Sequence, residues 1–408
     1  MRPFFELALV LAFAFSVGAG DWPQWRGPKR DGHSEDTGLL KQWSAGGPPL
    51  VWKTNGLGGG YSSVSVAKGK IFTMGDRSDS SFVHALDLQG KPLWSAKVGK
   101  PGGGGGYPGP RCTPTVDGER VYALGQYGDM VCVEAASGKE VWRKNLAKDF
   151  AGQVGGWGYS ESPLVDGEQV ICTPGGMQGT LLALNKKTGA KTWQSYQFTD
   201  HAEYSSPIVA EIGSVRQYIQ LTGDSVGGVA ADTGKLLWRA SRRGSTAIIP
   251  TPVFHRDHVY VTSGYGVGCN LFKISSTGSS FKAQEVYANK VMDNHHGGVV
   301  LVGEHIYGYS DGKGWVCQNF MTGEMVWNDK KLGKGSISYA DGHLYLRSEG
   351  SKGTVALIEA TPEGYREGGR FDQPNRSGKE SWPHPVIAGG KLYLRDQDLL
   401  LCYDVQSK

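Results

Sequence analysis

Apolar and polar positions alternate in short runs along most of the chain, and turn residues separate the runs. The stretch "SPLVDGEQVICTPGGMQGTLLALNKKTGAKTW" (residues 162–193) shows the pattern, with Val-, Ile- and Leu-rich runs divided by Asp-Gly, Gly-Gly and Thr-Gly pairs. Alternation with a period of two is typical of half-buried β-strands, and such pairs are typical of tight turns. The stretch therefore predicts four short antiparallel strands.

This unit recurs with a period near 45 residues, and five copies end in Gly-x-x-x-Trp. Such a period is typical of a propeller blade, in which four strands form one antiparallel sheet. The copies begin near Ser62, Thr113, Ser162, Ser206, Thr251, Gly298, Ser336 and His384. The sequence therefore predicts an all-β fold, an eight-bladed β-propeller of four-stranded antiparallel blades, with less than about 5% helix against the usual third.

The eighth copy stops after three strands. Its missing outer strand is expected at the other end of the chain, in "PPLVWKTN", where Val51–Lys53 has the tryptophan-bearing character of the other outer strands. Pairing of this strand with Leu399–Tyr403 would close the ring and leave no open sheet edge.

The Gly-x-x-x-Trp ending resembles the tryptophan-docking motif of PQQ-like (quinoprotein-type) β-propellers, over Leu50 to Val405. In that family the tryptophan of one blade packs against the next blade. The resemblance implies this structural docking role for Trp52, Trp94, Trp142, Trp193, Trp238 and Trp327. In the fifth and seventh copies, "SSFKAQEVY" and "EGYREGGRF" take the place of the tryptophan segment.

Three segments are expected. Residues 1–20 have an early arginine, an apolar run and small residues, as in a secretory signal peptide, and the run of about 11 residues is too short to span a bilayer. Residues 21–49 resemble the N-terminal strap of secreted PQQ-like proteins. Trp22 and Trp25 are expected on the propeller wall, with Arg26 over an indole face, sealing the closure seam. Residues 50–408 form the propeller.

The family includes enzymes and scaffolds, and the residues favour a scaffold. Quinoprotein dehydrogenases of this fold hold PQQ and calcium with a vicinal cysteine pair and Glu, Asn and Asp side chains. This sequence has no adjacent cysteines and no Cys-x-x-Cys-His haem motif. We therefore expect no cofactor, and interpret the chain as a non-catalytic binding scaffold, nearer to the propeller of outer-membrane barrel assembly. A PQQ-dependent oxidoreductase with calcium and a carbohydrate-binding propeller are the alternatives.

Six cysteines are present. Cys132, Cys317 and Cys402 occupy one place on the third strand of three copies, too far apart to be bridged. Cys112 and Cys172 are expected on inner strands of neighbouring blades. Buried free thiols are therefore predicted.

The links from the outer strand of one blade to the inner strand of the next should all emerge on one face, around the channel mouth. They are rich in the aromatic and charged residues that binding surfaces favour. The predicted binding residues are Tyr61, Tyr107, Arg111, Trp157, Tyr159, Glu161, His201, Tyr204, Arg243, His295, His296, Trp382 and His384. The alternative is that these aromatic residues plug the channel and pack on neighbouring blades.

Trp157, Tyr159, Tyr204 and Arg243 come from successive links and are expected to converge at the mouth. In "MDNHHGG", Asp293, His295 and His296 form a polar loop, with a metal site as the alternative.

The expected partner is an envelope or extracellular protein or peptide, bound by a periplasmic or secreted monomer. The net charge of +4 over 408 residues, without a basic run, argues against nucleic acid.

Overall fold

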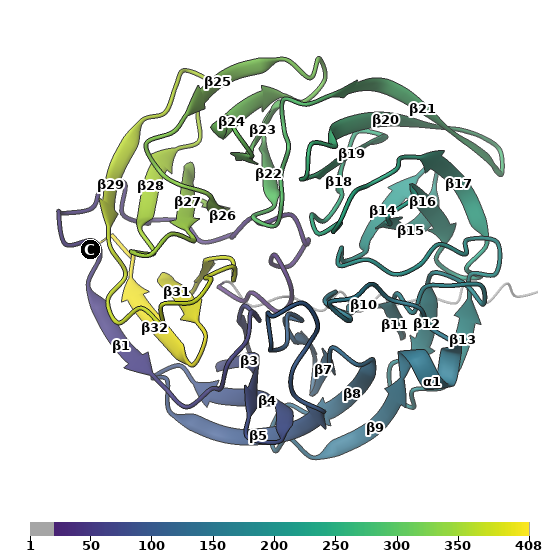
Figure 1. Ribbon diagram of the computed structural model, residues 1–408, viewed down its shortest axis with the longest axis horizontal. Coiled ribbons are helices and arrows are strands. Elements are labelled where there is room, and N and C mark those ends of the chain that lie inside the picture. The colour runs from purple at the N-terminus through teal and green to yellow at the C-terminus, as the bar shows by residue number, and fades with distance from the viewer. Residues whose placement is uncertain (1–19, 408) are drawn as a thin grey trace, which may run out of the picture.

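The computed structural model describes residues 20–407, so the expected signal peptide falls almost wholly outside the described residues. Eight four-stranded antiparallel sheets form a closed ring, as predicted (Figure 1). We number these sheets as blades 1 to 8 in chain order. Each first strand begins within a few residues of the expected start of its repeat. No helix in the described part of the chain is long and apolar enough to cross a membrane.

The strands of the first four blades follow the chain from the channel outward. Blade 1 is β2 (Ser65–Ala67), β3 (Lys70–Arg77), β4 (Ser80–Asp87) and β5 (Pro92–Gly99). Blade 2 is β6 (Thr115–Asp117), β7 (Arg120–Leu124), β8 (Asp129–Glu134) and β9 (Glu140–Asn145). Blade 3 is β10 (Leu164–Asp166), β11 (Gln169–Cys172), β12 (Leu182–Asn185) and β13 (Lys191–Gln194). Blade 4 is β14 (Ile208–Ile212), β15 (Val215–Leu221), β16 (Ser225–Ala230) and β17 (Leu236–Ser241).

The other four blades repeat this order. Blade 5 is β18 (Val253–His255), β19 (His258–Ser263), β20 (Gly268–Thr277) and β21 (Ser280–Asn289). Blade 6 is β22 (Val299–Val302), β23 (His305–Ser310), β24 (Gly314–Asn319) and β25 (Met325–Asp329). Blade 7 is β26 (Gly335–Ala340), β27 (His343–Ser348), β28 (Val355–Glu359) and β29 (Glu367–Phe371). Blade 8 is β30 (Val386–Ala388), β31 (Lys391–Asp396), β32 (Leu399–Asp404) and β1 (Leu50–Thr54).

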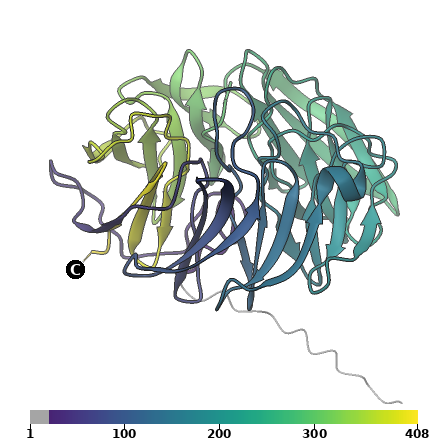
Figure 2. The same ribbon diagram turned by 60° about the horizontal axis from the view of Figure 1, so that its bottom comes forward.

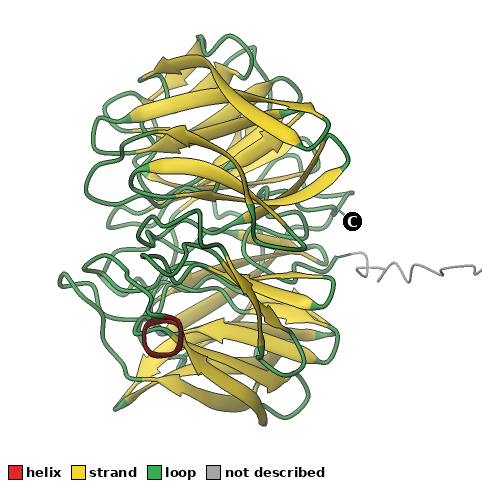
Figure 3. Cartoon of the chain, turned by 90° about the vertical axis from the view of Figure 1, so that its right-hand side faces the viewer, coloured by secondary structure: helices red, strands yellow, loops and turns green. Residues whose placement is uncertain are grey.

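The ring closes as the sequence predicts. Strand β1 pairs antiparallel with β32, and Leu50 lies opposite Tyr403 while Thr54 lies opposite Leu400. Figure 2 shows this purple strand beside the yellow strands from the end of the chain. Within residues 20–407 the single α-helix is α1 (Leu146–Phe150), so the low helix content is also confirmed. Figure 3 shows α1 in red among the loops of one face.

Tryptophan side chains of the outer strands connect neighbouring blades. The ring of Trp94 lies on Gly138 in the turn between β8 and β9, where an added Cβ would be 2.5 Å from it. Its indole N–H donates to the Ala135 carbonyl at 3.2 Å. The same pair of contacts joins Trp52 to Gly90 and Leu88, Trp142 to Gly189 and Lys186, and Trp193 to Gly234 and Ala231. Glycine suits the turn because its φ is positive and the ring fills the side-chain space.

Blades 4, 5 and 6 vary this contact. The indole of Trp238 donates within its own blade, to Gln217 Oε1 at 2.8 Å, although its ring packs with valines of blade 5. In blade 5, Tyr287 replaces the tryptophan and lies against Gly323 of the next blade. Its hydroxyl donates to the Phe320 carbonyl at 2.8 Å. Trp327 donates to the Thr361 carbonyl of blade 7 at 3.0 Å.

Blade 7 has no aromatic residue at this position. Gly369 lies opposite Leu357 of the third strand, which is the position that Trp94 occupies opposite Ala85 in blade 1. Trp43 of the strap fills the space: its Cβ lies 2.8 Å from the point where a Cβ on Gly369 would be. Trp43 also packs against Phe371, in a buried cluster that includes Leu401 of blade 8. The strap therefore packs at the closure seam, with Trp43 in a buried cluster of blades 7 and 8 and Trp22 in a buried cluster of blades 8 and 1.

The strap (residues 21–49) first runs through the central channel, where Figure 1 shows it in purple at the middle of the ring. Trp22 and Trp25, which were expected on the propeller wall, lie on its inner side, within the channel and at its mouth. Trp22 is buried and exchanges backbone hydrogen bonds with Val66 of β2, at 2.7 and 2.8 Å. The indole of Trp25 donates to Thr251 Oγ1 at 2.9 Å, ahead of blade 5.

Two arginines anchor the strap inside the channel. Arg30 donates to the Ser162 and Pro163 carbonyls at 2.6 and 3.0 Å. Arg26 donates to the Val299 carbonyl and lies against His384 Nδ1 rather than over an indole face. Burial lowers the pKa of both guanidinium groups to about 10, so both remain charged at neutral pH. The strap leaves through the face opposite the links, because Asp36 accepts from Gly390 N–H in the β30–β31 turn.

All six cysteines are free and buried. Cys132, Cys317 and Cys402 lie on third strands, as predicted. Cys112 is not on a strand but in the link before β6, and Cys172 ends the second strand β11.

We predict that Gly138→Ala destabilises the protein more than Gly118→Ala. Both glycines have positive φ, +74° and +55°, so both substitutions carry backbone strain of about 1 kcal/mol. An added Cβ meets nothing within 4 Å at Gly118 but would strike Trp94 at Gly138. Overpacking should cost Gly138→Ala a further 1–3 kcal/mol or so in the free energy of unfolding, measured by urea denaturation. Equal losses would show that the indole contact does not hold the blades.

We also predict that a thiol reagent reacts little with the native protein and with all six cysteines after denaturation without reductant. Burial raises the pKa of Cys112, Cys132 and Cys402 to about 12, so little thiolate is available in the fold. Fewer reactive thiols after denaturation would reveal disulfides.

Candidate functional site

A pocket lies at the channel mouth, on the face where the links between blades emerge. It holds about 950 Å³ of space, part of it open to solvent. The links supply most of its wall, and the strap supplies Trp25. The lining residues are Trp25, Tyr61, Tyr107, Arg111, Trp157, Ser160, Ser162, Tyr204, Ser206, Ala247, Ile249, Tyr265, His295, His296, Trp382 and His384. Since the strap fills the channel behind it, the pocket is closed at that end.

The structure brings nine of the thirteen predicted residues together in this pocket. They are Tyr61, Tyr107, Arg111, Trp157, Tyr204, His295, His296, Trp382 and His384. Six different links contribute these side chains, so only the closed ring assembles the pocket.

Two of the predicted residues point away from the pocket into the core. The Tyr159 hydroxyl donates to the Pro174 carbonyl at 3.0 Å. Glu161 accepts from the Thr173 hydroxyl at 2.6 Å, and burial raises its pKa to about 7 against the opposing effects of Thr173 and Arg30. Both side chains therefore belong to the buried interior and not to the pocket wall.

His201 and Arg243 are exposed and lie outside the pocket, in a second, polar depression beside Glu203. The expected convergence of four link residues is therefore limited to Trp157 and Tyr204, whose ring centroids are 5.9 Å apart. Arg243 and Tyr159 do not join them.

Trp25 and Tyr265 were missed by the sequence analysis. Trp25 reaches the pocket because the strap enters the channel. Tyr265 lies in the turn between β19 and β20, and turns between second and third strands emerge on the same face as the links. The strand order alone could therefore have indicated that this turn reaches the pocket face. Ser160, Ser162, Ser206, Ala247 and Ile249 complete the newly found lining.

Aromatic rings in mutual contact form much of the wall. Tyr61 stacks on Trp382 at 4.5 Å between centroids, and Tyr107 lies 5.0 Å from the same indole. Trp382 in turn lies 5.2 Å from His296, which stacks on His295 at 4.6 Å. Rings fixed by their neighbours offer a large apolar surface at little cost in conformational entropy.

The paired histidines are held from behind by charged residues. His295 Nε2 lies 2.8 Å from the Tyr265 hydroxyl, and its Nδ1 lies 2.8 Å from Lys334 Nζ. Burial, with the nearby His296 and Lys334, lowers the pKa of His295 to about 3, so its ring is neutral at physiological pH. Its Nδ1 therefore accepts a hydrogen bond from Lys334.

Glu349 fixes His296 and Trp382 together. Its Oε2 lies 2.8 Å from His296 Nε2 and accepts from the Trp382 indole at 2.9 Å. Burial alone would raise the pKa of Glu349, but these hydrogen bonds and the charges of His296 and Lys334 outweigh it and leave the pKa lowered. The carboxylate is thus ionised, and His296 Nε2 must carry the hydrogen that it shares with Glu349. The Nδ1 atom of His296 is buried and has no partner among the described residues.

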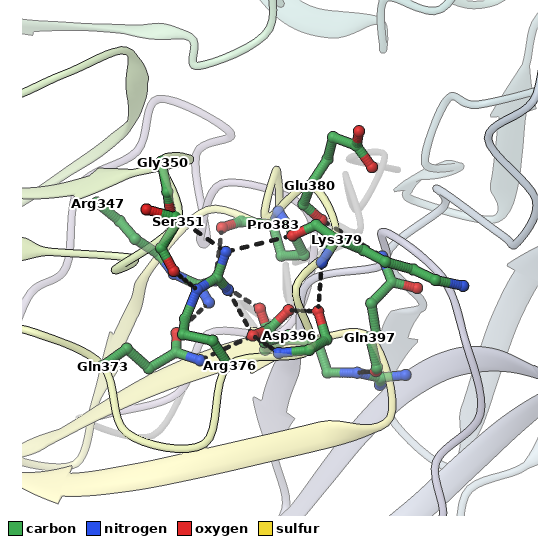
Figure 4. A network of polar contacts seen from close by, with 12 residues as sticks. Arg347, Gly350, Ser351, Gln373, Arg376, Lys379, Glu380, Pro383, Asp396 and Gln397 are labelled. Atoms are coloured by element: carbon green, nitrogen blue, oxygen red, sulfur yellow. Dashed lines mark hydrogen bonds and ion pairs between the residues drawn. The ribbon is translucent and has the colours of Figure 1, made fainter.

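A polar network holds the link that carries Trp382 and His384 (Figure 4). Asp396 is fully buried and forms an ion pair with Arg376. It also accepts from Gln373 Nε2 at 3.0 Å and from the Ser377 hydroxyl at 2.6 Å. Arg347 donates to Gln373 Oε1 and to the Arg395 carbonyl, both at 2.5 Å. These contacts tie strand β31 to residues 373–377 of the link.

The donor set does not fit calcium or a calcium-bound quinone. Calcium takes carboxylate and carbonyl oxygens, but the described residues that line the pocket include no Asp, Glu, Asn or Gln. Nor do residues 20–407 contain a group of three His, Cys, Asp or Glu side chains placed to hold a metal. Asp293, the third residue of the metal alternative, accepts from Gly266 N–H and does not line the pocket.

Comparison with known sequences gives one family over most of the propeller. The family model described as outer membrane protein assembly factor BamB matches residues 79–329. The curated protein of that name from Burkholderia pseudomallei is 28% identical over 164 residues, which are 40% of this chain and 36% of that protein. Its counterpart from Shewanella oneidensis is 24% identical over 279 residues, 64% of this chain and 66% of that protein. The chain thus spans less than two thirds of each relative's length.

Solved structures share the fold at low identity. BamB from Moraxella catarrhalis has a TM-score of 0.64 and 15% identity, covering 88% of this chain and 98% of that one. A quinohemoprotein alcohol dehydrogenase from Comamonas testosteroni has a TM-score of 0.65 and 11% identity, covering 95% and 81%. At these identities the likeness establishes the propeller alone.

We predict that His384→Asn makes the free energy of unfolding less sensitive to acid. Burial and the nearby Arg26 lower the pKa of His384 to about 3, whereas an unfolded histidine titrates near 6.5. The stability that its neutral ring contributes is complete above pH 6.5 and is lost as the pH falls towards 3. Between pH 7 and pH 5 the wild type should lose about 2 kcal/mol more than the variant. Equal losses in parallel denaturation series would contradict the prediction.

Proposed function

The chain belongs to the family described as outer membrane protein assembly factor BamB, and on that premise we propose that it is a non-catalytic binding scaffold of the bacterial envelope. It acts as a periplasmic or secreted monomer and binds a protein or peptide at the channel mouth. Both curated relatives carry the name of an assembly factor, which supports this class of function.

The aromatic pocket is the observation that carries the proposal. Its wall combines three tryptophans, four tyrosines and one arginine, the residue types most often found at binding hot spots. Its closed end favours insertion of a protruding group from a partner over passage through the ring.

The two alternative functions receive less support from the same pocket. Sugar sites combine aromatic faces with carboxylate and amide groups that bind hydroxyls, and the described lining has no such group. The same lack disfavours the calcium that a quinone enzyme of this fold would use.

We predict that Trp157→Ala weakens capture of partner protein from native envelope extract about tenfold or more, because truncation of a hot-spot aromatic costs roughly 2 kcal/mol or more. Trp157 lies at the mouth against Tyr204 and is only half-buried, so the variant should stay folded. Quantitative mass spectrometry of wild-type and variant pull-downs measures the change.

Lys235→Ala is the matched control, since Lys235 lies in the turn between β16 and β17 on the opposite face. Partner loss in this control, or undiminished capture by Trp157→Ala, would place the binding surface elsewhere. Dye-linked alcohol oxidation after addition of PQQ and calcium would contradict the non-catalytic scaffold itself.

A further inference from the structure

The charge of the pocket restricts what it can hold. Arg111 lines the pocket and has no ion-pair partner among the described residues. Its guanidinium lies 5.6 Å from the centre of the Tyr61 ring, and burial lowers its pKa without making it neutral at physiological pH. Since the described lining contains no carboxylate, an occupant with an anionic group is complementary and one with an ammonium group is not.

The hydrogen bonds of Arg111 leave part of its guanidinium available. Nη1 donates to the Gly109 and Trp157 carbonyls at 3.5 and 3.1 Å, and Nη2 donates to the Tyr107 carbonyl at 2.8 Å. A guanidinium has five N–H donors, so these bonds leave the Nε hydrogen and one Nη2 hydrogen without an acceptor in the described chain. Adjacent donors of this kind bind carboxylates in a planar, bidentate manner.

A second unsatisfied group lies across the same pocket. His296 is nine-tenths buried and lines the pocket, and its Nδ1 has no partner among residues 20–407. Because Nε2 is engaged by Glu349, Nδ1 is the ring nitrogen left for an occupant. A buried polar atom without a partner is costly, and a polar group of an occupant would satisfy it. The pocket therefore offers a cationic fork, an unsatisfied ring nitrogen and apolar walls.

The closed end decides how a polypeptide can enter. The strap fills the channel with Trp22, Arg26 and Arg30, all of them buried, so no chain passes through. A chain that enters from the mouth must end there or turn back within the pocket. A chain end fits this shape, and its carboxyl end supplies the anion, the apolar side chain and the amide N–H together.

We propose that the pocket binds the C-terminal end of a protein chain, with the terminal carboxylate on Arg111 and a last aromatic or aliphatic side chain among the rings. A polar backbone group of the bound end pairs with His296 Nδ1. This inference rests on the proposed scaffold function and names its ligand. Capture of a terminal carboxylate by main-chain or arginine donors is an established mode of peptide recognition.

The test uses the full chain and short N-acetylated alanine peptides. One peptide ends in phenylalanine with a free carboxyl group, a second is its C-terminal amide, and a third carries the phenylalanine internally. Binding is followed by calorimetry and by the fluorescence of the pocket tryptophans. The free acid should bind at least tenfold more tightly than the amide and than the internal peptide. Equal binding of the acid and the amide would overturn the proposal, and this comparison needs no variant to fold.

Two substitutions then locate the contact. Arg111→Gln and Arg111→Lys should each weaken the free acid about tenfold and leave the amide unchanged, because neither offers the planar fork. Arg243→Gln is the matched control, an exposed arginine on the same face outside the pocket, and should have no effect. Loss of acid binding in this control would move the site to the second depression.

Acetylphenylalanine alone separates a chain end from a free small acid. It should bind at least tenfold more weakly than the peptide acid, and equal affinity would make the ligand a small carboxylic acid instead. If the acid and the amide bind alike while Trp157→Ala still abolishes partner capture, the scaffold function stands and only this ligand assignment fails. If Trp157→Ala has no effect on partner capture, the partner binds outside this pocket, and the proposed binding face fails independently of the peptide result.

Discussion

The ring depends on one repeated contact, an aromatic ring of an outer strand lying on a turn glycine of the next blade. Each blade is a small sheet with two apolar faces, which can be buried only against its neighbours. The ring-on-glycine contact fixes the distance between neighbouring blades, and the indole hydrogen bond fixes the angle between them. Trp94 makes both contacts, with Gly138 and with the Ala135 carbonyl. Five of the eight blade junctions have this contact, four through an indole and one through Tyr287. Trp238 and Trp327 lack the turn glycine, and Trp43 of the strap fills the space on blade 7. Because the links lie on the blades, the same contact sets the geometry of the pocket.

The strap fills the central channel of the ring and so closes the inner end of the pocket. Arg26 and Arg30 lie in the channel and donate to carbonyl groups at or just before the first strands of blades 3 and 6. Burying two guanidinium groups is unfavourable unless their donors are satisfied, and the backbone oxygens of several blades supply those acceptors. The strap thereby closes the inner end of the pocket, where Trp25 and Arg26 both contact His384. The pocket thus derives its shape from the strap and its chemistry from the links.

The fold was predictable from the sequence because the repeat encodes it many times. The period, the turn pairs and the displaced strand at Val51–Lys53 each point to the same closed ring, and the structure confirms it. The face that carries the pocket was also predictable, since topology alone places all links on one side. Side-chain direction within a link was not: Tyr159 and Glu161 turn inward, while Trp157, two and four residues before them, turns outward. The path of the strap was equally hidden, because its anchors are arginine contacts to backbone carbonyls, which have no sequence signature.

The use of Trp43 and β1 to complete blades 7 and 8 has a consequence for the order of folding. Residues 39–54 are synthesised before any full blade, yet Leu39 and Trp43 pack in the cluster of blades 7 and 8, and β1 pairs with the last strand, β32. Joining them requires closure of a loop that contains nearly the whole propeller, and its entropic cost is repaid only when the terminal strands arrive. The other blades can form in sequence from local contacts, and completion of the ring is then a single late event. Loss of the C-terminal strands would therefore leave the first-made segment unpaired, and one missing strand would expose both ends of the chain to degradation and aggregation.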